Sequence, residues 1–342
     1  MIELSVRERD MLNRWQRGFP FVPRPFARVA RDAGMSEEEV IATVSRLQEA
    51  GVICRVGAVV RPNTAGASTL AAVSAPEDRL EEVARTISDQ PEVTHNYERE
   101  HELNLWFVVT AADRAGVDAA LARIRAETGL EVLDLPMVRA FHIDLAFAIA
   151  GGGSPGDGNG GMPASPGAGD GVPAPSPFDR ELLAAIEDGL PVVHEPYAEV
   201  ARWLNVGEDV VISRLSALHG SGVITRFGFV IHHRELGYCA NAMVVWDFDD
   251  RVLERAAGRI AAAEYVTLCY QRPRRPPRWR YNLFCMIHGT SRETVRRQID
   301  ELAERVGREL GLDEVPHAVL FSRRRFKQCG ARFSAGLKKG AA

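Results

Sequence analysis

The chain repeats itself, and this internal duplication restricts its possible folds more than any other feature. Among its 342 residues, the stretch 51–57 (GVICRVG) matches 222–228 (GVITRFG), and 25–30 (PFARVA) matches 196–201 (PYAEVA). Both matches share one offset of 171 residues. A register that stays constant over about 50 residues indicates two copies of one structural unit. The same order of elements is therefore expected twice.

A linker separates the two copies. Residues 151–177 read GGGSPGDGNGGMPASPGAGDGVPAPSP, and 16 of these 27 residues are Gly or Pro. Such a composition cannot build a hydrophobic core, and as a flexible coil it would span roughly 30 Å. We expect a disordered linker that joins the copies without fixing their orientation.

Each copy predicts a winged helix-turn-helix followed by a ferredoxin-like domain. In the first copy, Val40, Val44 and Leu47 lie at helical spacing, and Gly51 ends that helix. The pattern that follows is β-α-β-β-α-β, the ferredoxin-like order. We therefore expect an α+β protein with two tandem copies. The predicted parts are winged helix-turn-helix domains at 1–60 and 178–232, ferredoxin-like domains at 61–150 and 233–335, the linker at 151–177 and a tail at 336–342.

Composition excludes several classes of protein. The formal charge of −4 and the pI near 6.2 argue against a protein that coats nucleic acid or anionic membranes. The five cysteines are scattered and form no C-x-x-C pair, so neither a disulfide framework nor a zinc site is predicted. No apolar run reaches the roughly 18 residues that cross a bilayer, and no signal peptide is apparent. We expect a cytoplasmic protein with reduced thiols.

The helices in the position of a DNA-recognition helix do not favour DNA. The first, at 36–50, carries four glutamates and one arginine, so its approach to phosphates would be repulsive. The second, at 207–220, balances Arg214 and His219 against two acidic residues. We expect no DNA binding, and we interpret the winged domains as kept for packing and for pairing the two halves.

Two related polar motifs mark the ferredoxin-like domains. In the first copy, residues 95–101 read HNYEREH and residues 104–107 read NLWF. In the second copy, residues 269–272 read CYQR and residues 281–284 read YNLF. The two motifs share a tyrosine and an arginine two residues apart, followed by an Asn-Leu pair.

The spacing inside these motifs predicts a reactive surface. Because side chains alternate along an extended backbone, His95, Tyr97 and Arg99 should project from one face of a strand, as should Tyr270 and Arg272. Imidazole transfers protons near neutral pH, and guanidinium binds carboxylates bidentately. The motifs therefore favour an enzyme that acts on an acidic substrate.

This combination resembles a known family. A winged helix-turn-helix joined to a ferredoxin-like domain resembles the Lrp/AsnC regulators, and the two motifs resemble the siroheme decarboxylase branch, here with two related subunits fused as in heme d1 biosynthesis. The resemblance covers all but the linker. It implies non-oxidative loss of CO₂ from two acetate side chains of siroheme, giving didecarboxysiroheme. It also implies no separate cofactor, because the iron belongs to the substrate.

The implied chemistry suggests roles in the first copy. Loss of CO₂ leaves carbanion character on the macrocycle, so the protein has to hold carboxylates and deliver protons. His95 is the leading general acid and His101 a second candidate; Tyr97 would contact the macrocycle and Arg99 a carboxylate. Structural alternatives stay open for each: a strand histidine hydrogen-bonded inside the domain, simple aromatic packing, and an ion pair with a neighbouring glutamate.

The second copy predicts a different set. Leu268 stands where the first copy has His95, and leucine cannot transfer a proton, so the two sites should be unequal. The stretch 273–280 (PRRPPRWR) packs four arginines into eight residues, which we interpret as a polycarboxylate-binding loop, with RNA binding or a solvated basic loop as alternatives. The predicted substrate-binding residues are Tyr270, Arg272, Arg274, Arg275, Arg280, Asn282, His142, His288 and Lys327.

Two functions from different classes follow. The first is a siroheme decarboxylase with its pocket between or beside the ferredoxin-like sheets. The alternative is a heme- or tetrapyrrole-responsive transcription regulator of the Lrp/AsnC type. The two halves are expected to pair with each other. The number of active pockets, the order of the decarboxylations, the iron ligand, the heme pathway served, and the need for a homo-oligomer or a related subunit stay open.

Overall fold

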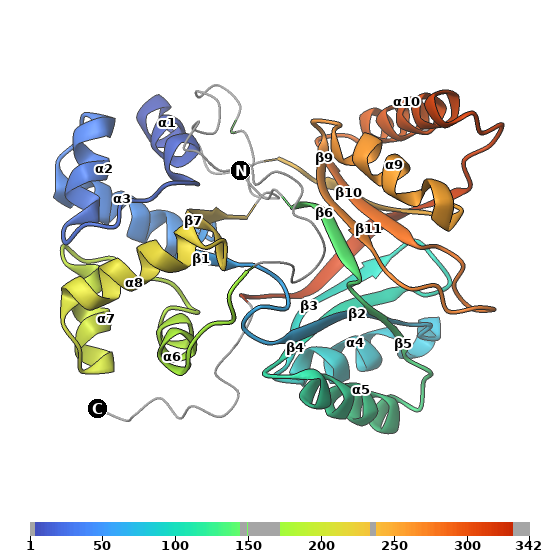
Figure 1. The fold of residues 1–342 in the computed structure, drawn as a ribbon, viewed down its shortest axis with the longest axis horizontal. Helices are drawn as coiled ribbons and strands as arrows, with labels where there is room; N and C mark the ends of the chain where they lie inside the picture. Colours follow the sequence, from blue (N-terminus) through green and yellow to red (C-terminus); the bar gives the residue numbers. More distant parts are fainter. Residues whose placement is uncertain (1–3, 144–148, 150–171, 233–236, 331–342) are drawn as a thin grey trace.

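The computed structural model describes residues 4–143, 149, 172–232 and 237–330; most of the predicted linker and the whole predicted tail lie outside these ranges. Each half begins with three helices and one strand, shown on the left of Figure 1. These elements are α1 (Val6–Trp15), α2 (Pro25–Ala33), α3 (Glu37–Glu49) and β1 (Ile53–Val60), followed in the second half by α6 (Pro177–Ala185), α7 (Pro196–Leu204), α8 (Glu208–Gly220) and β7 (Ile224–Ile231).

Local sequence explains where these helices begin. Ser36 accepts a hydrogen bond from the backbone N–H of Glu39, and the Glu39 side chain accepts one from the backbone N–H of Ser36, which together form a capping box. Ser5 caps α1 in the same way. Pro25 and Pro196 occupy the first position of α2 and α7, where a missing N–H costs nothing.

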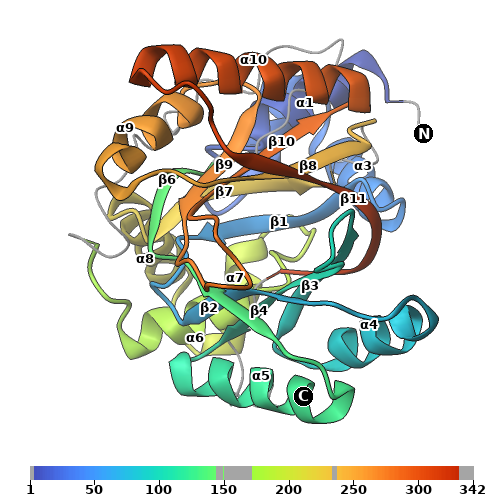
Figure 2. The same cartoon turned by 90° about the vertical axis from the view of Figure 1, so that its right-hand side faces the viewer.

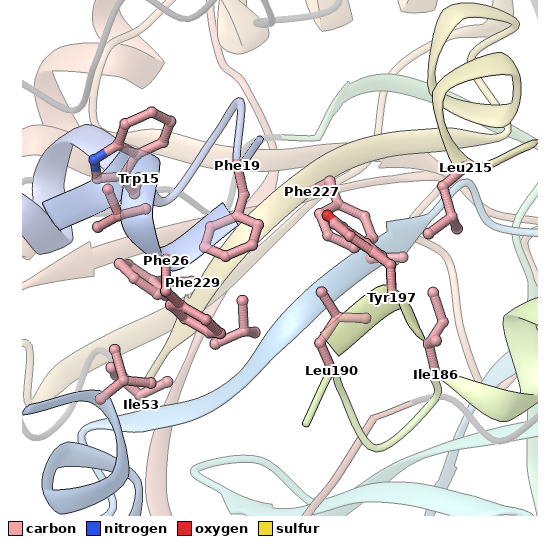
Figure 3. Packing of buried hydrophobic residues seen from close by; sticks show 14 of the residues in the cluster. Trp15, Phe19, Phe26, Ile53, Ile186, Leu190, Tyr197, Leu215, Phe227 and Phe229 are labelled. Atoms are coloured by element: carbon pink, nitrogen blue, oxygen red, sulfur yellow. The ribbon is translucent and has the colours of Figure 1, made fainter. Parts of the chain in front are cut away.

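The two winged domains form one body. Strands β1 and β7 pair antiparallel, with Gly57 directly opposite Gly228. Both halves fill a common core, in which the Phe19 ring of the first half lies 5.8 Å from that of Phe229 in the second, as Figure 3 shows. Gly228 has to be glycine, because an added Cβ would collide with the carbonyl oxygen of Trp15. The predicted pairing of the halves is therefore present at this level.

Each half continues into a ferredoxin-like domain, which confirms the predicted fold class. In both halves the order is β-α-β-β-α-β, apart from a short 3₁₀ turn (Glu77–Arg79). The first comprises β2 (Ala67–Val73), α4 (Leu80–Asp89), β3 (Val93–Arg99), β4 (Leu105–Ala111), α5 (Arg114–Thr128) and β5 (Leu133–Pro136), extended by β6 (Arg139–Ile143); the second comprises β8 (Ala240–Trp246), α9 (Asp250–Ala261), β9 (Val266–Gln271), β10 (Leu283–Gly289), α10 (Arg292–Leu310) and β11 (His317–Gln328).

The last strands cross between the halves. The sheet order is β5-β2-β4-β3-β11-β8-β10-β9-β6. The first part of β11 pairs with β8 of its own half and the second part with β3 of the other, while β6 leaves its own half and pairs with β9. Strands β5 and β6 stand at the two ends of this order. Because they also follow each other closely in the chain, the two edges of the sheet lie near each other. Figure 2 shows both crossings, β6 in green and β11 in dark red.

The sheet therefore folds into two facing parts with helices outside. Alternate residues of each strand point to opposite faces: Ala71 and Phe107 pack under α4 and α5, whereas Ala72 and Trp106 face the other half. Helices α9 and α10 cover the second half in the same way. No helix in the described ranges is long and apolar enough to cross a membrane. Polar residues on the inner faces thus lie between the two halves.

Candidate active site

A cavity of about 460 Å³ lies where the inner faces of the two sheet parts meet the β1–β7 pair. Its walls carry large apolar side chains, among them Trp106, Met243 and Phe284. Residues from both winged domains and both ferredoxin-like domains contribute, so the complete cavity exists only when the halves are paired. Apolar and aromatic walls of this kind suit a flat organic ligand.

The two motif strands present matching tyrosine and arginine pairs to this cavity. The Arg99 guanidinium lies 5.6 Å from the centre of the Tyr97 ring, and that of Arg272 lies 5.4 Å from the Tyr270 ring. Arg99 also donates to the carbonyl oxygen of Leu320 at 3.1 Å. Both halves thus repeat the geometry that the sequence pattern predicted, and all four side chains face one space.

Arg272 binds the other half in the same manner. Its Nη1 donates to the carbonyl oxygen of Leu135, the counterpart of the bond from Arg99 to Leu320. Burial lowers the pKa of Arg272 to about 10, so the side chain is still a cation at neutral pH. Its Nε is buried and has no hydrogen-bond partner within the described part of the chain. A buried N–H of this kind is costly unless a ligand supplies an acceptor.

His95, on β3, lines the cavity on the side where the motif strand faces the winged domains. Its Nδ1 lies 3.0 Å from Oγ1 of Thr94, and its ring stacks on Tyr97 with 6.3 Å between centres. Burial, with a smaller contribution from the positive charge of Arg55, lowers the pKa of His95 to about 4. The imidazole is therefore neutral at pH 7 in the ligand-free protein.

The second half supplies its own imidazole from a different strand. His288 on β10 lines the cavity, and its Nδ1 lies 2.9 Å from Oγ1 of Thr267. Thr267 precedes Leu268 as Thr94 precedes His95, so equivalent threonines anchor one histidine in each half. Leu268 itself lines the cavity. The two halves are therefore unequal in detail, yet each contributes one imidazole to the lining of the cavity.

Two predicted residues serve the backbone instead of the cavity. The Nδ1 of His101 accepts a hydrogen bond from the N–H of Leu103 at 3.0 Å, which stabilises the turn after β3. Asn282 is buried and binds both backbone groups of Phe248, through Oδ1 at 3.0 Å and Nδ2 at 2.9 Å. Neither side chain is among those that line the cavity, so the structural alternative describes their placement.

The predicted arginines of the loop after β9 also lie away from the cavity. Arg274 and Arg280 form ion pairs with Asp247 at 2.8 and 2.7 Å, and Arg275 donates to the carbonyl oxygen of Asp134 at 3.2 Å. None of the three arginines lines the cavity. Local acidic partners and a carbonyl bind these arginines, and Trp279 holds the loop against Trp106, with 5.1 Å between ring centres.

The two candidates on the crossing strands also lie away from the cavity. Lys327 donates to the carbonyl oxygens of Ser88 and Gln90 at 2.6 and 3.1 Å. His142 sits opposite Cys269 in the pairing of β6 with β9. Lys327 sits opposite Asn96 in the same way, so the two positions are equivalent, but neither is part of the lining of the cavity.

Four basic residues that lie on β1 and β7 or directly after them line the cavity, and sequence reasoning missed them. They are Arg55, Arg61, Arg226 and His232. His232 donates from Nδ1 to the carbonyl oxygen of Gly51 at 2.8 Å, and a hydrogen bond to Cys54 raises its pKa. One signal could have found two of the four: the duplicated GVICRVG and GVITRFG segments both keep their arginine.

The cavity is strongly cationic in a protein of negative net charge. Five arginines line it against one glutamate, Glu187, among the residues that the structure describes; the arginines are Arg55, Arg61, Arg99, Arg226 and Arg272. With aromatic walls between them, these groups suit a flat molecule that carries several carboxylates.

Comparison with known sequences decides the family. Models of two domains match both halves: an AsnC-like ligand binding domain at residues 65–142 and 235–327, and a siroheme decarboxylase NirDL-like HTH domain at 8–53 and 179–224. The siroheme decarboxylase NirDL subunit of Paracoccus denitrificans is 44% identical over 338 residues, covering 97% of each chain. The chain belongs to the siroheme decarboxylase family.

Further relatives clarify the duplication. The siroheme decarboxylase NirD subunit of Pseudomonas aeruginosa is 53% identical over 141 residues, which are 41% of this chain and 94% of that subunit. One half of the present chain is therefore similar to a separate subunit elsewhere. A crystal structure of the siroheme decarboxylase NirDL in complex with an iron-uroporphyrin III analogue has 28% identity and a TM-score of 0.65, covering 96% of this chain and 95% of that one.

Proposed function

We propose that this chain is a carboxy-lyase that converts siroheme into didecarboxysiroheme. The observation that carries the proposal is the cavity with five arginines against one glutamate and with aromatic walls. Siroheme is a flat macrocycle with carboxylates around its rim, which is the ligand that such a surface suits. Membership of the siroheme decarboxylase family supports the same substrate. The scattered thiols are unpaired, which favours a reducing, cytoplasmic location.

The reaction needs no redox partner. Each acetate loses CO₂, the electron pair of the broken C–C bond delocalises into the macrocycle, and one proton converts the carbon into a methyl group. The protein therefore has to orient the carboxylate and supply one proton for each acetate. We assign orientation to Arg99 and Arg272, whose guanidinium groups reach the cavity from the two halves. We assign proton delivery to His95, with His288 as its counterpart in the second half.

The depressed pKa of His95 fits this role only when substrate is present. A general acid has to carry a proton, and the free protein holds His95 neutral at pH 7 because its pKa is about 4. Carboxylates of the substrate would place negative charge beside the ring and neutralise the effect of Arg55, so the pKa of His95 rises on binding. Substrate binding would therefore produce the protonated form of His95 in the site.

We expect siroheme binding to take up protons at pH values between the pKa of free His95, about 4, and its higher pKa in the complex. A group that is neutral in the free protein and protonated in the complex makes binding tighter as the pH falls through the pKa of the bound state. Calorimetric titrations in buffers with different ionisation enthalpies measure this uptake. The variant His95→Gln should lose most of it; an unchanged uptake would assign the proton to another group.

The activity itself is tested by incubating the purified full chain with siroheme without oxygen. The expected result is a product lighter by the mass of two CO₂, formed without any added subunit, because both halves of the cavity are present in one chain. Stable binding without loss of mass would contradict the proposal and favour the tetrapyrrole-responsive regulator. The acidic first turn of α3, with three consecutive glutamates, speaks against that alternative and against DNA binding.

A further inference from the structure

The pairing of β1 with β7 places two arginines symmetrically over the cavity. Gly57 and Gly228 are equivalent residues of the duplication and lie opposite each other, so a local twofold axis passes between them. Arg55 and Arg226 each precede this central pair by two residues. Arg55 faces Val230, which is four residues from Arg226, so their α-carbons lie about 13 Å apart along the strands (roughly 3.3 Å per residue).

A second symmetric pair extends this arrangement. Arg61 and His232 also share the offset of 171 residues, and both line the cavity. Arg61 donates to the carbonyl oxygen of Gly222 at 3.1 Å, as His232 does to that of Gly51 at 2.8 Å. Each bond joins one half to the other, which fixes the direction of both side chains. The winged domains therefore present four basic groups on the side of the cavity opposite the motif strands.

The arginines of this surface are placed for an anionic ligand. Arg226 is only 8% exposed and lines the cavity, so a carboxylate bound there would interact with its charge in a site shielded from water. Arg55 uses Nη2 to bind the carbonyl oxygen of Ala58 at 3.1 Å, yet its buried Nε has no hydrogen-bond partner within the described ranges. An acceptor bound in the cavity would satisfy that N–H.

We propose that the β1–β7 pair is a substrate clamp, in which Arg55 and Arg226 bind carboxylates that the macrocycle retains, while Arg99 and Arg272 bind the acetates that react. This inference rests on the proposed function. It gives the winged domains a role in substrate recognition, in addition to packing and pairing the two halves. It also explains why both copies of the duplicated segment carry an arginine at the same position.

Two ligands that differ in carboxylate distribution test the clamp. Iron-uroporphyrin III carries carboxylates all around its ring, whereas heme carries propionates on one edge only. We expect Arg55→Gln and Arg226→Gln to weaken the binding of iron-uroporphyrin III by about 10- to 100-fold, the loss typical of one charge-assisted hydrogen bond. Binding of heme should change by less than about threefold. Absorbance titrations give both dissociation constants.

A matched control is Arg202→Gln, which removes the same charge from an exposed side chain of α7 that pairs with Glu199. This control should bind both ligands as the wild type does. Arg226→Lys keeps the charge and should recover part of the affinity. If Arg226→Gln does not fold, Arg55→Gln provides the same test. Unchanged affinity for iron-uroporphyrin III, or an equal loss for both ligands, would overturn the clamp. These titrations measure binding without turnover, so failure of the clamp and failure of the proposed decarboxylation can be distinguished.

Discussion

Replacing His95 with alanine is expected to slow CO₂ release from siroheme by about 100-fold or more, the usual effect of losing a general acid. The side chain lines the cavity, Thr94 orients its Nδ1, and its ring stacks on Tyr97. The loss should appear mainly in kcat, and the affinity for siroheme should lose only the pH-dependent part that comes from proton uptake by His95. Single-turnover measurements of CO₂ separate the chemical step from product release.

The matched control for this variant is His101→Ala. His101 belongs to the same motif but binds the backbone N–H of Leu103 and does not line the cavity. We expect CO₂ release at nearly the wild-type rate, with a loss of stability of about 1 kcal/mol from the broken hydrogen bond. Equal rates for His95→Ala and the wild type would remove His95 from the mechanism. His288, held by Thr267 in the other half, would then be the acid to test.

Replacing Arg272 with glutamine is expected to lower kcat/KM for siroheme by about 100-fold. The guanidinium is a cation at neutral pH despite its lowered pKa, and its buried Nε awaits an acceptor. Losing a charge-assisted bond to a carboxylate in a site shielded from water costs about 1.5–3 kcal/mol. Steady-state kinetics of product formation measure the effect. Arg272→Lys should recover only part of it, because an ammonium group cannot form the bidentate fork.

The control for this variant lies two residues further along the chain. Arg274 carries the same charge but pairs with Asp247 and Asp250 outside the cavity. Arg274→Gln should leave kcat/KM within about threefold of the wild type, since exposed ion pairs contribute little. If Arg274→Gln were as damaging as Arg272→Gln, the placement of the loop away from the substrate would be wrong.

Much of the fold was predictable because its signals are local. The serine caps before α1 and α3, the prolines at the start of α2 and α7, and the apolar spacing of Val40, Val44 and Leu47 act within a few residues. Side chains alternate along a strand, and this period of two predicted that Tyr97 and Arg99 share one face. The constant offset of 171 residues between the copies then predicted the same elements in the second half.

The rest could not be predicted, because it depends on contacts between distant residues. The arginine-rich loop and the motif strand offer the same guanidinium groups, and only the packing of Trp279 on Trp106 shows that Arg274 turns to Asp247 while Arg272 enters the cavity. In the sequence, the arginines of β1 and β7 fall inside the predicted winged domains, and no local pattern places them in a cavity. Their place in the lining of the cavity follows from how the winged pair packs against the sheets.

The sequence by itself determined two copies of a winged helix-turn-helix and a ferredoxin-like domain, together with one strand face in each that carries a tyrosine and an arginine, because periodicity, caps and duplication are properties of neighbouring residues. Only the tertiary structure decided that β6 and β11 cross between the halves, and that residues from all four domains enclose one cationic cavity. The reason is physical: a cavity is made by surfaces that meet across more than a hundred residues of chain, and no local pattern records which surfaces will meet.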